Sequence, residues 1–358
     1  MFLTFVKSET HILLLSPYYI TTSNMPKGLN WKNIYMYKSR KEIASTTSVL
    51  DQTIQILKSL NLPFEFDNDH PECIYVNYYD RKYFIDTAPD QRYITVGIHD
   101  IDSFSLDNES ESLRLHQIID VCNTVNFTKL CCINDNGTVG VDCIIDLLLM
   151  PELPDCDKYL ICAFQTIVAT IVSYFQMKED GEPNPVRLTN IESYFYKTPS
   201  ELQSTPSACD LLFSVLDSMK LKYHYDGKAI TRVDYQGFEF AIIALKEFKF
   251  LNICFWGFDD IDQDDNSRLL KSYCIMDYIN YVIRQRLVCS GPIEGTYSVN
   301  GVANILWIPE IPDLGRWLRN VFDDIIVSYG MYTELKENPN GLIEAMSTGY
   351  TSPSPYQA

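Results

Sequence analysis

The sequence predicts an α+β protein made of two tandem α-β-β-β-α-β-β-α repeats, each an antiparallel sheet packed with helices. Three observations predict this fold. Apolar residues recur at helical spacing in some segments and alternate in others. The same order of segments occurs in both halves of the chain. One short phrase is also written twice, as MPELPD at 150–155 and as IPEIPD at 308–313, which is 158 residues later (308 − 150).

The elements of the first half follow from apolar periodicity, β-branched and aromatic content, and the turn residues that bound each run. Asn136-Gly137 predicts a hairpin turn, because both residues tolerate positive φ. The polar stretch DIDSFSLDNESES is expected to lead from the third strand into a helix. The predicted order is a helix at 46–61, strands at 73–79, 82–87 and 93–99, a helix at about 109–126, strands at 127–133 and 138–150, and a helix at about 156–178.

The second half shows the same order of patterns. Its acidic stretch FDDIDQDDNS again separates a strand from a helix, and the turn of its hairpin falls near Gly295. The predicted elements are a helix at 208–220, strands at 228–234, 237–245 and 248–255, a helix at about 268–286, a hairpin at 287–307, and a helix at about 314–329.

Residue matches support a duplication. The 158-residue offset pairs Gly137 with Gly295 and Phe164 with Phe322. Proline-containing sequence without a clear period separates the halves and predicts a linker. The predicted division is an N-terminal extension at 1–45, a first domain at 46–180, a linker at 181–206, a second domain at 207–332 and a flexible tail at 333–358.

Composition narrows the class of protein. The chain has 358 residues, is 46% hydrophobic and 13% aromatic, and carries a net charge of −18, so it can build large cores and is repelled by nucleic-acid phosphates. Its 11 cysteines include no Cys-x-x-Cys pair, which favours buried thiols in a reducing, cytoplasmic setting. The apolar run at 159–177 is interrupted by polar residues, so we expect a buried helix and no membrane span.

Each copy of the repeated phrase is interpreted as a joint that ends a strand and starts the last helix of its repeat. The first proline cannot donate to a strand ladder, the second fixes the chain before the helix, and the aspartate is placed to cap the helix. Leu153 and Ile311 are expected to tuck under as apolar anchors. The joint residues are Pro151, Pro154, Asp155, Pro309, Pro312 and Asp313.

The segment DVCNTVNFTKLCCINDNGTVGVDCIIDLLL, in which a helix end is followed by a hairpin, resembles the YbjN family. That family is similar in fold to the class I chaperones of type III secretion. The resemblance covers about 48–178 and 207–332, and Asn123 and Asn126 are its most telling residues. At the 158-residue offset they align with Tyr281 and Arg284, although Asn280 lies one position away. The second copy is therefore expected to lose the asparagine role.

The resemblance implies an α+β sandwich without shared catalytic chemistry. It also implies a protein-binding role, since the related chaperones bind extended partner segments on apolar patches and sheet edges. The segment FKFLNICFWGF at 248–258 is apolar on both sides of a strand, which indicates a sheet covered on both faces. The cover could be the other domain, a second subunit or a partner peptide. The candidate partner surface is Phe250, Trp256, Phe258, Asn123 and Asn126.

No local motif indicates a metal site, a cofactor or catalysis. Asp260, Asp262 and Asp264 fall at the first ligand positions of a calcium loop, but Asp265 and Lys271 stand where glycine and glutamate are needed. The five histidines lack metal-ligand spacing. The expected function is therefore a non-enzymatic protein-binding module, chaperone-like or regulatory, that binds a protein partner or itself. The alternatives are an enzyme with a composite site in the cleft between the repeats, and an acidic immunity-type or structural protein.

Overall fold

The computed structural model describes residues 48–87, 92–125, 127–135, 138–181, 196–204 and 206–338. These residues form an α+β fold with two six-stranded antiparallel sheets and seven helices, as the sequence predicts. The predicted N-terminal extension, the Asn136-Gly137 turn and most of the linker lie outside the described residues.

The first repeat forms a sheet in the order β1-β2-β3-β4-β6-β5. Ser48 caps its first helix by accepting a hydrogen bond from the backbone N–H of Asp51. The elements are α3 (Val49–Ser59), β1 (Phe64–Phe66), β2 (Cys73–Tyr78), β3 (Arg81–Asp86), β4 (Tyr93–Ser105), α4 (Glu109–Val125), β5 (Lys129–Asp135), β6 (Thr138–Leu148) and α5 (Cys156–Asp180).

The second repeat forms a sheet in the order β7-β8-β9-β10-β12-β11, which matches the first strand for strand. Its first helix is also capped by a serine, Ser207. The elements are α7 (Ala208–Ser218), β7 (Lys222–Tyr225), β8 (Ile230–Tyr235), β9 (Phe238–Ala244), β10 (Phe250–Asp262), α8 (Asn266–Val282), β11 (Arg286–Ile293), β12 (Thr296–Leu306) and α9 (Leu314–Glu337). A short helix, α6 (Pro199–Ser204), lies within the predicted linker.

The long strands β4 and β10 extend into the first part of the polar stretches that were expected to be loops. Each contains a bulge where its register against β6 or β12 shifts. Asp100 (φ 51°) and Gly257 (φ 78°) occupy the left-handed region at equivalent points of the two bulges. The extra residues let the strand bend and then pair again. The short strands β1 and β7 were not predicted, and α9 includes 333–337 of the predicted tail.

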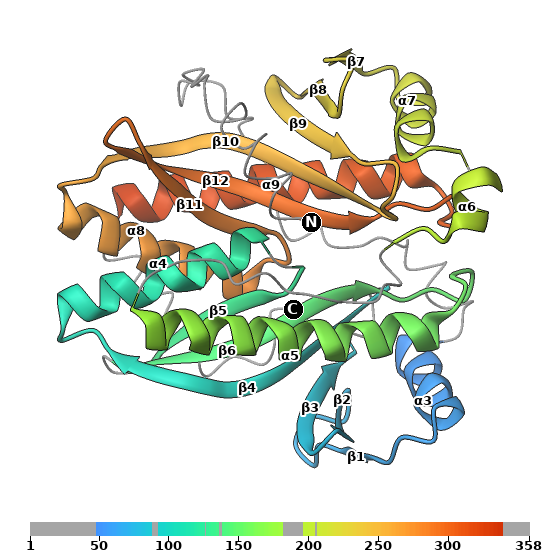
Figure 1. Ribbon diagram of the computed structural model, residues 1–358, viewed down its shortest axis with the longest axis horizontal. Helices are drawn as coiled ribbons and strands as arrows, with labels where there is room; N and C mark the ends of the chain where they lie inside the picture. Colours follow the sequence, from blue (N-terminus) through green and yellow to red (C-terminus); the bar gives the residue numbers. More distant parts are fainter. Residues whose placement is uncertain are drawn as a thin grey trace.

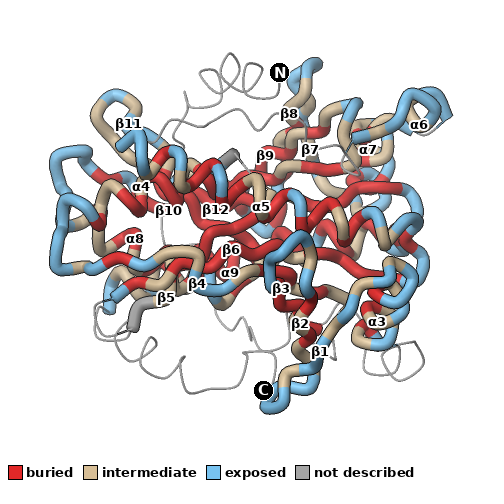
Figure 2. Tube along the Cα trace, turned by 60° about the horizontal axis from the view of Figure 1, so that its bottom comes forward, coloured by how far each residue is buried: buried red, intermediate tan, exposed pale blue. Residues whose placement is uncertain are grey.

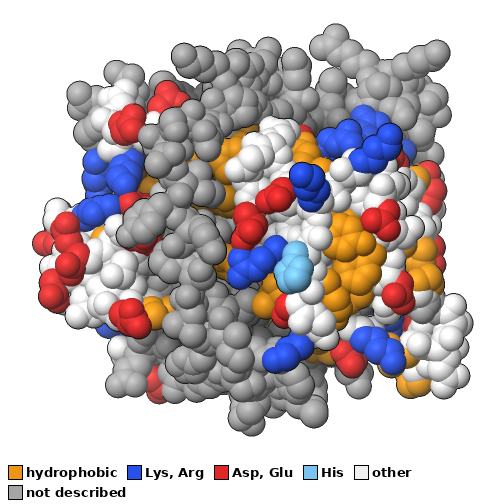
Figure 3. Space-filling view, turned by 90° about the horizontal axis from the view of Figure 1, so that it is seen from above, with side chains coloured by type: hydrophobic (Ala, Val, Ile, Leu, Met, Phe, Trp, Pro, Cys, Tyr) orange, Lys and Arg blue, Asp and Glu red, His pale blue; other side chains and the backbone are white. Residues whose placement is uncertain are grey.

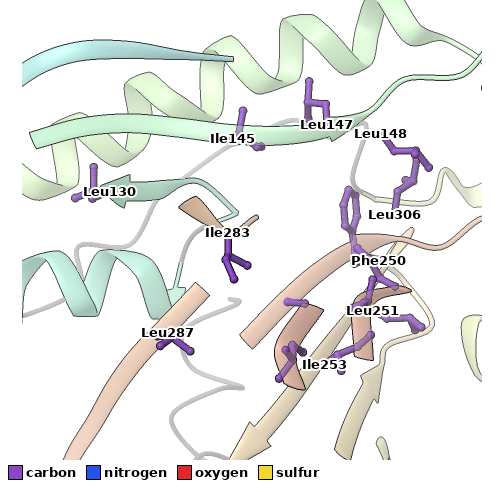
Figure 4. Close-up of a cluster of buried hydrophobic side chains, with 14 of the residues drawn as sticks. Leu130, Ile145, Leu147, Leu148, Phe250, Leu251, Ile253, Ile283, Leu287 and Leu306 are labelled. Carbon is purple, nitrogen blue, oxygen red and sulfur yellow. The ribbon is translucent and has the colours of Figure 1, made fainter. Parts of the chain in front are cut away.

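The two sheets lie one above the other, with α4 and α8 side by side between them at one end (Figure 1). One continuous region of buried residues runs through both repeats (Figure 2). Figure 4 shows side chains of both repeats in this core, among them Ile145 and Leu148 of the first and Phe250 and Leu306 of the second. α5 is long and apolar enough to cross a membrane, but much of it is buried within this core.

The repeated phrase forms the same joint in both repeats. Leu153 and Ile311 are buried beneath the turn, as predicted. The backbone N–H of each donates a hydrogen bond to the carbonyl of the residue three positions before it. Asp313 caps α9 by accepting from the Arg316 N–H at 3.0 Å, which confirms that part of the prediction. The prediction is wrong for Asp155, which makes no capping bond and instead pairs with Lys158 at 3.0 Å.

The inner sheet edges, β5 and β11, are each covered by a helix of the other repeat. α8 packs beside β5, and α4 packs beside β11. The buried Lys129 donates to the Ile283 carbonyl at 2.7 Å, just after α8. The buried Arg286 donates to the carbonyl of Asn123 at 2.8 Å, in the last turn of α4. An exposed strand edge can recruit other strands, and this arrangement removes both edges from solvent.

The two repeats share a buried asparagine clamp. Asn123 donates its amide to the Leu130 carbonyl and accepts from the Leu130 N–H, at 3.1 and 2.7 Å. Asn280 makes the same pair of bonds to Leu287, at 3.0 and 2.6 Å. The structural offset is therefore 157 residues here (280 − 123), and the expectation that the second copy lost the role of Asn123 is wrong.

We predict that Asn280→Ala lowers the free energy of unfolding by about 2–4 kcal/mol, because it leaves a buried N–H and a buried carbonyl of Leu287 unsatisfied. Asn123→Ala is expected to have a similar effect. Urea unfolding followed by circular dichroism measures both. Asn77→Ala, at an exposed strand position, is the control and should change the unfolding free energy by less than about 0.5 kcal/mol. Equal urea midpoints for Asn280→Ala and Asn77→Ala would contradict the clamp.

Candidate functional site

Most of the predicted partner surface lies inside the protein. Phe250 and Phe258 are each only 8% exposed and Asn123 is 2% exposed, so the prediction is wrong for these three residues. Phe250 packs on Phe127 of the first repeat, with ring centroids 5.0 Å apart, which confirms the alternative in which the other domain covers this strand. Trp256 is partly exposed, and Asn126 lies outside the described residues.

The position of Phe258 follows from the bulge in β10. Phe250 and Trp256 lie on one side of the strand, as the alternation predicts. Gly257 then adopts a left-handed conformation, and the next side chain turns to the opposite side. Phe258 therefore packs against Tyr329 of α9, with ring centroids 5.1 Å apart.

The first sheet has a second face, opposite α5, that we call the first outer face. Its side chains alternate with core residues such as Tyr83, whose ring packs on Phe164 of α5 at 4.5 Å. Gly97 lies in the middle, where an added Cβ would come within 2.7 Å of both Phe84 and Ile144. The described side chains of this face are Cys73, Tyr75, Asn77, Lys82, Phe84, Asp86, Thr95, His99, Asp142, Ile144 and Asp146.

Aromatic side chains on the first outer face are held by polar partners. His99 stacks on Phe84, with ring centroids 3.9 Å apart and an interplanar angle of 9°. Its Nδ1 lies 2.7 Å from Oδ2 of Asp142, whose Oδ1 accepts from the Asp100 N–H in the bulge at 2.9 Å. The Lys82 ammonium lies 4.2 Å from the ring centre of Tyr75, a cation–π distance. These contacts therefore orient the ring of His99 against Phe84 and the ammonium of Lys82 against Tyr75.

Carboxylates crowd one row of the same face. Burial raises the pKa of Asp86, and the nearby Glu72 and Asp146 raise it further. Asp146 accepts from Thr95 Oγ1 at 2.6 Å and lies 3.7 Å from the Lys129 ammonium. Tyr281 of α8, which is 46% exposed, lies near enough for Asp142 and Asp86 to raise its pKa, after the larger effect of burial. The first outer face thus combines negative charge with aromatic surface.

The equivalent face of the second sheet has the same register but different chemistry. Ile243 stands where the first has Asp86, and Asn304 stands where it has Asp146. Asn304 accepts from the Asn252 amide at 2.8 Å, and Arg232 lies 5.8 Å from the ring of Trp256. Figure 3, seen from the side of the second sheet, shows hydrophobic side chains among charges of both signs.

A cavity of about 60 Å³ lies between the two repeats. Both repeats line it at equivalent positions, including Lys129 and Arg286, and it has room for a few water molecules. Arg284 lies over the ring of Tyr93 at 4.1 Å on its wall. This volume is far below the several hundred Å³ of ordinary small-molecule sites.

The thiols are poorly suited to nucleophilic chemistry. Burial raises the pKa of Cys122, Cys131 and Cys254 to about 12, so these thiols stay protonated near neutral pH.

The acidic run that was compared with a calcium loop ends β10 and enters α8, where Asp265 accepts from the Arg268 N–H at 3.0 Å. Within the described residues, one group of His, Cys and acidic side chains could hold a metal ion: His116, Cys132 and Asp277.

The comparisons with known proteins add no relationship: neither a protein-family model nor a curated protein matches this chain.

The residues of the first outer face were not singled out from the sequence. They come from four strands, and β6 pairs with β4 although β5 lies between them in the chain, so Asp86, Thr95 and Asp146 become neighbours only in the folded sheet. The alternation of apolar and polar residues within each strand was the available signal.

One buried carboxyl beside the cavity predicts a pH effect on stability. Gln285, which lines the cavity, donates to Asp324 at 3.3 Å, and burial raises the pKa of Asp324 from 3.8 to about 7. The folded state therefore holds this proton more tightly than the unfolded state. The stabilisation is complete below about pH 4 and is lost as the pH rises through about 7.

We therefore predict that Asp324→Asn stabilises the protein at pH 8, by up to about 4 kcal/mol, and flattens its stability profile between about pH 4 and 7. Urea unfolding at several pH values measures this. Asp264→Asn, at an exposed position, is the control and should leave the shape of the profile unchanged. A profile for Asp324→Asn with the wild-type slope would contradict the assignment.

Proposed function

We propose that this chain is a non-enzymatic protein-binding module, chaperone-like or regulatory, and that its first outer face takes an extended partner segment with basic and apolar side chains. The difference between the two outer faces carries this proposal. The second sheet keeps the same strand order with Ile243 and Asn304, so folding does not require carboxylates at Asp86 and Asp146. A role in binding explains why the first face carries them.

The charge of the face supports a basic partner. Asp86 is held close to Glu72 and Asp146, so a Lys or Arg side chain placed there would relieve repulsion between like charges. The whole chain carries −18, which would speed its encounter with a positively charged segment. Tyr75 and Tyr281 offer partly exposed aromatic surface for apolar side chains.

The arrangement of the repeats supports binding on a face. Helices of the opposite repeat already cover the edges of β5 and β11, so a partner strand cannot be added there without separating the repeats. The resemblance to the YbjN family and to secretion chaperones supports the same class of role, because those chaperones bind extended segments. All 11 cysteines are free thiols, in line with the cytoplasmic location that we also propose.

Different observations bear on the two alternative functions, the enzyme with a composite site and the acidic immunity-type or structural protein. A composite active site would need a cleft between the repeats, and the cavity of about 60 Å³ found there has room for only a few water molecules. An acidic protein that neutralises a basic partner would use the same electrostatics. It would bind a folded basic protein, whereas we propose an extended segment whose alternate side chains contact the sheet.

The proposal predicts binding of a peptide of about twelve residues in which Lys and Val alternate, measured by fluorescence anisotropy. A peptide with Glu in place of Lys should bind at least about tenfold more weakly, and added salt should weaken the basic peptide. Asp86→Lys should weaken binding about tenfold, because one attractive contact becomes repulsive.

Asp234→Lys is the matched control, since it makes the same charge change at an exposed position of the second sheet. It should alter the affinity less than about twofold. Equal weakening by the two variants would mean that only net charge matters, and it would overturn the assignment to the first outer face. Tight binding of folded basic proteins without binding of the peptide would favour the neutralising alternative.

A further inference from the structure

Three side chains from different elements meet between the two repeats. His116 is on α4, Cys132 is on β5, and Asp277 is on α8. Their potential ligand atoms all lie within 4.8 Å of one another. His116 and Cys132 are buried, and the side chain of Asp277 is 17% exposed. Imidazole, thiolate and carboxylate are the three ligand types that zinc takes in proteins.

The histidine is held in the orientation of a metal ligand. Nδ1 of His116 lies 2.7 Å from the Ser112 carbonyl, which can only accept, so Nδ1 carries the proton. Nε2 then points at Oδ2 of Asp277, 2.9 Å away. Histidines that bind a metal through one ring nitrogen commonly donate a hydrogen bond from the N–H of the other to a backbone carbonyl. The ring is also fixed by stacking on Tyr273, with centroids 5.2 Å apart.

The second repeat contains a copy of the group without its key donor. The 157-residue shift places Tyr273 at the position of His116, Cys289 at that of Cys132, and Asp120 at that of Asp277. Asp120 accepts from the Cys289 N–H at 2.7 Å, and its side chain also bonds Tyr273. The fold therefore accepts other polar side chains at this place and does not need histidine.

We propose that His116, Cys132 and Asp277 bind one Zn²⁺ ion that joins the two repeats. Mixed nitrogen, sulfur and oxygen donors in a buried setting favour zinc over magnesium or calcium, which prefer oxygen alone. Binding releases the proton of the Cys132 thiol to solvent, and no redox change is involved. Two ligands come from the first repeat and one from the second, so the ion stabilises the contact between them. This site is independent of the proposed peptide-binding face.

The test is metal binding by the full chain after treatment with a chelator. We expect one Zn²⁺ per chain by elemental analysis. Co²⁺ added in place of zinc should give the visible absorption of a site with one thiolate ligand. His116→Tyr should abolish both signals while the protein stays folded, because Tyr273 occupies the equivalent position in the second repeat. Cys289→Ala is the matched control and should retain the metal.

Asp277→Asn provides a second variant of nearly unchanged shape, should His116→Tyr fail to fold. It is expected to weaken zinc binding at least tenfold, measured by competition with a chelating dye. The opposing explanation is that His116 and Asp277 form only an ion pair. Wild-type protein that binds no more zinc or cobalt than a folded His116→Tyr or Asp277→Asn variant would establish the ion pair and overturn the zinc site.

Discussion

The structure depends on two buried cations, one from each repeat. Each lies at the C-terminal end of a helix of the other repeat. Lys129 donates to the carbonyl that follows α8, and Arg286 donates to a carbonyl in the last turn of α4. Carbonyls at a helix C-terminus lack intrahelical partners and carry partial negative charge, so they suit a cation. Burial lowers the pKa of Arg286 to about 10, and it remains charged at neutral pH. Separating the repeats would strip both cations of these partners, which makes the two repeats one structural unit.

Once the repeats are joined, each position can be compared with its counterpart. At some positions the two repeats make the same interaction. Asp102 accepts from the Tyr174 hydroxyl at 2.6 Å in the first repeat, and Asp259 accepts from the Tyr332 hydroxyl at 3.1 Å in the second. These bonds tie each bulged strand to the last helix of its repeat, and they serve the fold. Other pairs differ, and the fold tolerates both versions. A residue whose counterpart lacks its chemistry is therefore a better candidate for function than one whose counterpart repeats it.

The duplication could be predicted from sequence because it rests on local patterns: helical spacing, alternation and the repeated proline joint. The predictions that failed depend on the exact alignment of the two repeats or on the side of a strand to which a residue points. The joint predicts an offset of 158, but the offset before the hairpin is 157, so Asn123 was aligned with Tyr281 instead of Asn280. The bulge at Gly257 reversed the side to which Phe258 points. The strand that carries Phe250 was predicted to be covered on both faces, but periodicity does not say by what, and Phe127 lies 123 residues away in the chain (250 − 127).

The first outer face could not be predicted either, because its residues become neighbours only when the strands pair. The free-energy cost of packing its carboxylates supports a role in binding. Asp86, Thr95 and Asp146 lie in one row only after β4 pairs with β3 on one side and with β6, which follows β5 in the chain, on the other. Packing Asp86 near Glu72 and Asp146 costs folding free energy, since burial and like charge both raise its pKa. The second sheet avoids that cost with Ile243 and Asn304 in the same rows. The fold itself therefore does not require this cost at the position of Asp86, and a positively charged partner segment on this face would offset it.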